Sequence, residues 1–129
     1  MTRRFRSTER GFTLVELMVV VAVIGVLATI AIPLFVNVQA RGRIAKAQAD
    51  SRTLASAVGV YSAHMGTIPT ALTQLTADAT NAQGNRAGPF MGSMPTPPGG
   101  WAAYSYSANV SAGTYTITST GDGTSVIYP

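Results

Sequence analysis

An apolar stretch near the N-terminus constrains the fold of this chain more than any other feature. No charged residue occurs from Leu17 to Val36. As an α-helix rising about 1.5 Å per residue, this stretch spans roughly 30 Å, the thickness of the hydrocarbon core of a bilayer. A basic flank, which favours a cytoplasmic N-terminus, precedes it and consists of Arg3, Arg4, Arg6 and Arg10. The sequence therefore predicts one membrane-spanning helix with its N-terminus in the cytoplasm.

A single carboxylate, that of Glu16, lies in the first turns of this helix. Acidic side chains inside membrane segments are rare and usually functional. The chain itself does not obviously supply a partner for this carboxylate, so we expect one from another molecule. Two simpler interpretations are a secretory signal peptide over residues 1–31 and a plain signal anchor. The apolar run is long for a signal peptide, and a plain anchor leaves Glu16 unexplained.

The charge distribution argues against several function classes. The net charge of +4 comes from the basic leader and from a cluster after the apolar run, formed by Arg41, Arg43, Lys46 and Arg52. From Leu54 onward only Arg86, Asp78 and Asp122 carry charge, which argues against nucleic-acid binding. The chain has no cysteine, and its one histidine, His64, is expected in solvent or against a sheet. We therefore expect no enzymatic activity.

Helical periodicity continues beyond the apolar run. One face of a helix is predicted by the spacing of Ile44, Ala47, Ser51, Leu54, Val58, Tyr61 and Met65. The simplest interpretation is one helix from about Phe12 to His64, apolar in its first half and amphipathic in its second. Pro33 is expected to kink it, and Gly66 and Pro69 to end it.

The sequence pattern of the C-terminal part predicts a small antiparallel sheet. Thr70–Leu75 is a candidate short helix, and residues 76–100 are rich in Gly, Pro and Asn and predict a loop. Strands are predicted at Ala103–Val110, Thr114–Ser119 and Ser125–Tyr128, with a hairpin at Asn109–Gly113. We expect the apolar face of this sheet to be covered by the amphipathic helix, which makes the fold class α+β.

The N-terminal pattern resembles a known signature. GFTLVELMVVVAVIGVLATIAIP, from Gly11 to Pro33, is similar to the N-terminus of type IV pilins and type II secretion pseudopilins. The resemblance implies a pilin fold and cleavage between Gly11 and Phe12 by a prepilin peptidase. It further implies N-methylation of Phe12, giving N-methylphenylalanine, and pairing of Glu16 with the Phe12 amine of a neighbouring subunit during assembly. The domains expected are a cleaved leader (1–11), a transmembrane assembly helix (12–36), its amphipathic continuation (37–66) and a loop-rich β domain (67–129).

Later segments resemble the major pseudopilin more loosely. Gly66–Thr70 is similar to its Gly-x-Tyr-Pro-Thr element, with Ile68 in place of Tyr, and Met94–Tyr106 and Ser119–Gly123 are similar to two C-terminal loops. In the major pseudopilins an acidic C-terminal loop binds calcium, which implies Asp122 as a calcium ligand here. Only one acid stands in this loop, however, and Asp122 between two glycines is equally expected to make a turn. No other cofactor is expected.

The resemblance implies a structural subunit of a filament, in first place the major pseudopilin of a type II secretion system driving protein export across the outer membrane. The implied partners are other copies of the chain, the prepilin peptidase, an inner-membrane assembly platform, minor pilins or pseudopilins, and the bilayer before assembly. The implied location is the bacterial inner membrane, with the C-terminal domain in the periplasm, followed by a periplasmic pseudopilus or an extracellular pilus. The alternatives are a major or minor type IV pilus pilin for adhesion, motility or DNA uptake, a tip-binding minor pilin, and a membrane-anchored protein that does not assemble.

Overall fold

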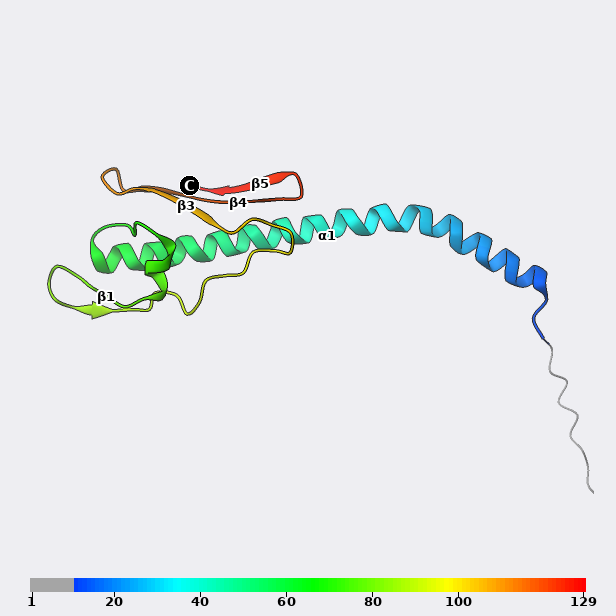
Figure 1. The fold of residues 1–129 in the computed structure, drawn as a ribbon, viewed down its shortest axis with the longest axis horizontal. Helices are drawn as coiled ribbons and strands as arrows, with labels where there is room; N and C mark the ends of the chain where they lie inside the picture. The colour runs from blue at the N-terminus through cyan, green and yellow to red at the C-terminus, as the bar shows by residue number, and fades with distance from the viewer. Residues whose placement is uncertain (1–10) are drawn as a thin grey trace, which may run out of the picture. The chain divides into compact units, whose positions relative to one another are not determined.

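The computed structural model describes residues 11–129 and divides the chain into two units, one ending at Val38 and the other comprising Gln39–Pro129. Helix α1, Leu14–Met65, belongs to both units and continues through Pro33 (Figure 1). This confirms the single long helix predicted from about Phe12 to His64. The remaining elements belong to the second unit, which is a small α+β domain, as expected.

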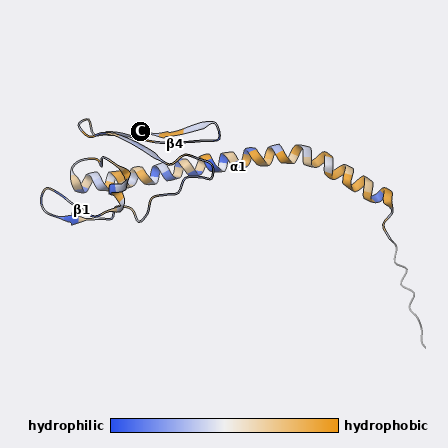
Figure 2. Cartoon of the chain, viewed as in Figure 1, coloured by the Kyte–Doolittle hydropathy of each residue, from blue (hydrophilic) through white to orange (hydrophobic). Residues whose placement is uncertain are grey.

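The first half of α1 is apolar on all sides and contains no buried residue. Figure 2 shows a nearly continuous apolar colouring along this half. The helix is long and apolar enough to cross a membrane, and its most apolar window contains no buried residue. Large side chains such as Leu17, Ile24 and Phe35 are about 60% exposed. An apolar surface of this size needs lipid or neighbouring helices to cover it.

A glycine ends the helix where the sequence predicted it. Gly66 has a left-handed φ of 75°, and its N–H donates to the Ser62 carbonyl oxygen at 2.8 Å. A β-carbon disfavours this conformation, so Gly suits the position. A short 3-10 helix, Leu72–Thr76, follows and lies close to the predicted Thr70–Leu75 helix.

The loop predicted over residues 76–100 contains a small hairpin that the sequence analysis missed. Strands β1 (Ala79–Thr80) and β2 (Arg86–Ala87) pair antiparallel. The Asn81 side-chain oxygen accepts the N–H groups of Gln83 and Asn85 and so closes the connection. His64 Nε2 donates to the Asn85 carbonyl oxygen at 3.1 Å, so the half-buried histidine contacts this hairpin and not the main sheet.

The three predicted strands form one antiparallel sheet in the order β3-β4-β5. Their bounds are Ser105–Asn109, Thr114–Gly121 and Thr124–Tyr128. Pairing of Asn109 with Thr114 confirms the predicted hairpin. Strand β4 runs two residues further than expected, and Gly121 pairs with Thr124 across a turn made by Asp122 and Gly123.

The core of the second unit lies between the sheet and the amphipathic part of α1. Leu54, Val58 and Tyr61 of the helix pack in one cluster with Leu75 and with Ile117 of β4. Leu54, Leu75 and Ile117 have no exposed surface. The predicted helix face is therefore the buried one. A second, smaller cluster contains Ala47, Trp101 and Val126, with Ile44 against it.

Candidate assembly site and loop cluster

Thr13 and Glu16 form a reciprocal capping box at the start of α1. The backbone N–H and the hydroxyl of Thr13 each donate to Glu16 Oε2 at 2.9 Å, and the Glu16 N–H donates to Thr13 Oγ1 at 3.2 Å. A Thr-x-x-Glu sequence before an apolar run is the usual signature of this arrangement. The signature is present in the sequence, and it predicts the contact between Thr13 and Glu16 from local spacing alone.

The capping box changes the interpretation of the carboxylate. We had expected Glu16 to lack a partner within its own chain, but Thr13 supplies one for Oε2. No residue from 11 to 129 donates a hydrogen bond to the second oxygen, Oε1. One half of the carboxylate is therefore satisfied locally, and the other half is available to a donor from another molecule.

The predicted processing residues lie directly before this cap. The Phe12 side chain is 89% exposed. A β-carbon built at Gly11 would meet no heavy atom within 4 Å. Within residues 11–129, nothing covers the Gly11–Phe12 peptide bond, which leaves it open to an enzyme.

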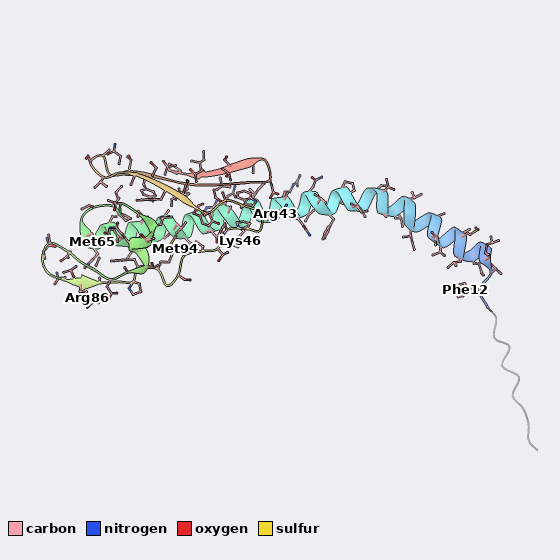
Figure 3. The ribbon with its side chains drawn as sticks, in the orientation of Figure 1. Phe12, Arg43, Lys46, Met65, Arg86 and Met94 are labelled. Atoms are coloured by element: carbon pink, nitrogen blue, oxygen red, sulfur yellow. The ribbon has the colours of Figure 1, made fainter. Side chains whose placement is uncertain are left out.

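The fourth predicted site residue, Asp122, lies in the second unit and is far from the others in the sequence. Its Oδ2 accepts from Arg43 Nε at 2.6 Å, and its Oδ1 accepts from Arg43 Nη2 at 2.8 Å. The Trp101 indole N–H also donates to Oδ2, at 2.9 Å. Figure 3 labels Arg43 on the part of α1 that belongs to this unit. We refer to Arg43, Trp101 and Asp122 as the loop cluster.

A second cation of the helix ties another loop segment to α1. Lys46 Nζ, on the turn of α1 that follows Arg43 (Figure 3), donates to the Thr96 carbonyl oxygen and to Asp50 Oδ2, both at 2.6 Å. The Tyr104 hydroxyl donates to the same Asp50 oxygen at 2.6 Å. Burial, followed by this hydrogen bond, raises the pKa of Tyr104 well above its ordinary value, so the phenol stays protonated and remains a donor.

The electrostatics of the loop cluster favour the ionised carboxylate. The hydrogen bonds from Arg43, and then from the Trp101 indole, hold the pKa of Asp122 below its ordinary value. The same contact raises the pKa of Arg43. In the sequence Arg43 is indistinguishable from the other basic residues of the helix, because a partner 79 positions along the chain leaves no local signal.

A calcium ion does not fit the donors around Asp122. Calcium takes six to eight oxygen ligands, usually with more than one carboxylate. Both oxygens of Asp122 already accept N–H groups, and one of the donors is a cation. Residues 11–129 contain no group of three or more His, Cys, Asp or Glu side chains that could hold a metal. The turn interpretation of Asp122 is confirmed, since this residue and Gly123 both have left-handed φ values, 50° and 70°.

Comparison with protein families connects these features. Residues 6–32 match the prokaryotic N-terminal methylation motif, and residues 35–126 match type II secretion system protein G. The second match covers more than half of the chain. The chain belongs to the type II secretion system protein G family. The suspected relationship to pilins and pseudopilins is thereby confirmed.

Curated relatives are type IV pilins that match a part of the chain. The type IV major pilin protein PilA of Myxococcus xanthus is 52% identical over 54 residues, which are 42% of this chain and 24% of that protein. The type IV major fimbrial protein FimA of Dichelobacter nodosus is 43% identical over 53 residues, 41% of this chain and 34% of that protein. The chain thus spans a quarter to a third of the length of these two relatives. No solved structure matches the chain.

Proposed function

We propose that the chain is the major pseudopilin of a type II secretion system, a filament subunit that is drawn from the inner membrane and drives protein export across the outer membrane. The extent of the family match carries this proposal. The protein G match includes the β domain as far as Val126, whereas the matches to PilA and FimA cover 42% and 41% of the chain. The match to protein G therefore includes most of the β domain and supports a pseudopilin.

The first step of the mechanism is processing. A prepilin peptidase cleaves between Gly11 and Phe12 and methylates the new amine of Phe12. The uncovered peptide bond and the exposed Phe12 side chain support this step, because a peptidase needs access to the backbone. Cleavage creates an ammonium group one residue before the capping box of Thr13 and Glu16.

The second step is storage and assembly through a single surface. The apolar half of α1 exposes its side chains all round, so the bilayer covers them in the precursor and neighbouring helices cover them in the filament. Transfer from lipid to protein then needs no change in the helix itself. An inner-membrane assembly platform and minor pseudopilins act as partners in this transfer.

The third step is recognition between subunits. Thr13 holds Oε2 of Glu16, and Oε1 is left for the Phe12 ammonium of the neighbouring subunit. An unpaired charge in an apolar helix bundle is strongly unfavourable, so this pairing selects one axial register. Thr13 acts as a positioning residue, because it orients the carboxylate before the neighbour arrives.

Intact mass and one matched pair of variants test the proposal. We expect protein from isolated membranes to lack residues 1–11 and to carry about 14 Da more, for one methyl group on Phe12. Replacing Glu16 by Gln keeps the side-chain size and removes the charge, and should abolish filaments while the protein remains in the membrane. Glu16→Asp, which keeps the charge, should retain part of the assembly. A full-length mass, or normal filaments from Glu16→Gln, would refute the mechanism.

A type IV pilus subunit for adhesion, motility or DNA uptake is the second candidate, favoured by the 52% identity to PilA of Myxococcus xanthus. Deletion of the gene distinguishes the two. A pseudopilin deletion traps exported enzymes in the periplasm and leaves surface fibres intact. A pilin deletion removes surface fibres and leaves export intact.

A further inference from the structure

The turn between β4 and β5 directs a carboxylate toward the helix. Asp122 and Gly123 form a two-residue connection between Gly121 and Thr124, with left-handed φ at both residues. An Asp-Gly or Asn-Gly pair is the usual sequence for such a turn. The turn therefore fixes the backbone at Asp122. From there the side chain reaches Arg43, which lies 79 positions earlier in the chain.

The loop before β3 joins the same carboxylate. Trp101 donates its indole N–H to Asp122 Oδ2, and the next residue, Ala102, donates its N–H to the Thr120 carbonyl oxygen at 2.8 Å. The Ala102 carbonyl oxygen in turn accepts from Ser119 Oγ at 3.0 Å. One carboxylate thus gathers three segments that are separate in the sequence: the helix, the loop before β3 and the β4–β5 turn.

The positive charge that meets the Asp122 carboxylate is a guanidinium, which neutralises it as a divalent cation would. Arg43 donates to both oxygens of Asp122 in the two-pronged geometry that suits a carboxylate. A second carboxylate near the loops, that of Asp50 on α1, is bound by Lys46 and Tyr104. A calcium ion at Asp122 would therefore meet a neighbouring positive charge and, among the described residues, no second free carboxylate.

We propose that Arg43 takes the place of a metal ion in this chain, so that the β4–β5 turn and the Trp101 loop are fastened to α1 without calcium. The ion pair is built into the chain and forms whenever the domain folds, whatever the calcium concentration outside the cell or in the periplasm. This proposal is independent of the choice between a pseudopilus and a pilus, because it concerns the second unit alone.

The test measures unfolding of the full-length protein in detergent micelles. Trp101 is the only tryptophan, so its fluorescence reports directly on the loop cluster. The thermal midpoint is measured in EGTA, in millimolar calcium and in millimolar magnesium. We expect the same midpoint in all three solutions, because the described residues form no metal site at Asp122.

Variants test whether Arg43 is the cation that holds the β4–β5 turn and the Trp101 loop on α1. Arg43→Gln removes the guanidinium, and Asp122→Asn removes the carboxylate but keeps a favoured turn residue. Each should lower the midpoint by about 4 °C or more, and the double variant should lower it little further because both changes break one interaction. Arg43→Lys keeps the charge but loses the two-pronged contact, and should give an intermediate midpoint.

Arg41→Gln is the matched control, because Arg41 lies on the same helix, is exposed, and forms no ion pair with any residue from 11 to 129. Its midpoint should equal that of the wild type. A wild-type midpoint that rises with calcium but not with magnesium would overturn the proposal, since a calcium site would then exist. An Arg43→Gln midpoint equal to that of Arg41→Gln would overturn it as well.

Discussion

The substitution Gly121→Ala tests how tightly Trp101 packs against the end of β4. A β-carbon at Gly121 would lie 2.3–2.5 Å from Cγ, Cδ1 and Cδ2 of the indole. These separations are far shorter than any van der Waals contact, so one partner has to move. Gly121 is not among the glycines with positive φ, and the backbone itself therefore accepts alanine. The substitution isolates a steric effect from a conformational one.

The surroundings of the indole determine how much unfolding free energy the Gly121→Ala substitution removes. Trp101 is 7% exposed and packs in a cluster with Ala47 and Val126, so displacing the ring disturbs packed neighbours. Displacing it also removes the indole N–H from Asp122. Overpacking of a well-filled core costs about 1–3 kcal/mol, and three ring atoms in the overlap place this substitution at about 3 kcal/mol. For a unit of this size that corresponds to a fall in thermal midpoint of about 12–24 °C.

The assay follows thermal unfolding of the full-length protein in micelles by circular dichroism and by Trp101 fluorescence. Gly59→Ala is the control, because Gly59 lies in α1 and a β-carbon there would meet nothing within 4 Å. Alanine in place of a helical glycine should raise the unfolding free energy by about 0.5–1 kcal/mol. A Gly121→Ala midpoint within about 2 °C of the wild type, with unchanged Trp101 emission, would refute the close contact inferred here.

Three further predictions concern the core, the helix cap and the turn carboxylate. Leu54→Ala should lower the free energy of unfolding in urea by about 2–5 kcal/mol, because Leu54 is fully buried. Val60→Ala, at a position 58% exposed, should change it by less than about 0.5 kcal/mol. Equal effects would contradict the assigned core. Thr13→Val removes the side-chain half of the capping box, so amide exchange in the first turn of α1 should be faster than in Thr13→Ser, which keeps a hydroxyl; equal exchange rates would argue against the box. The contact with Arg43 holds the pKa of Asp122 below its ordinary 3.8, so the stability that this carboxylate adds is complete above pH 3.8 and is lost as the pH falls through the lower pKa of the folded state. The difference in midpoint between wild type and Asp122→Asn should therefore be constant from neutral pH to about pH 4.5 and shrink below it, and a difference that persists at lower pH would contradict the ion pair.

The elements with a regular pattern were predicted well. The apolar run and the spacing from Ala47 to Tyr61 predicted the long helix and its buried face, because side chains three or four positions apart share one side of a helix. Alternation of tyrosine with serine and threonine predicted β3 and the start of β4 for a similar reason. In both cases the pattern depends only on residues that are neighbours in the sequence, so the sequence contains all the information needed.

The errors fall where a structural element is short or a partner is distant. Strands β1 and β2 have two residues each, too few for alternation to register. Arg43 was grouped with the exposed cations of the helix, although it binds Asp122. The capping box is a different kind of error, since Thr13 and Glu16 are only three positions apart and their spacing alone was enough to predict it.

The sequence by itself determined the apolar half of the helix, the N-terminal methylation motif, the amphipathic face and the three main strands. Each of these depends on local spacing, which the physics of helices and strands converts directly into structure. The tertiary structure alone decided that the carboxylate of Asp122 meets the guanidinium of Arg43 and the indole of Trp101. A contact across 79 positions forms only after the sheet has packed on the helix, and a lone acid in a turn has the same local sequence whether its partner is a metal ion or an arginine.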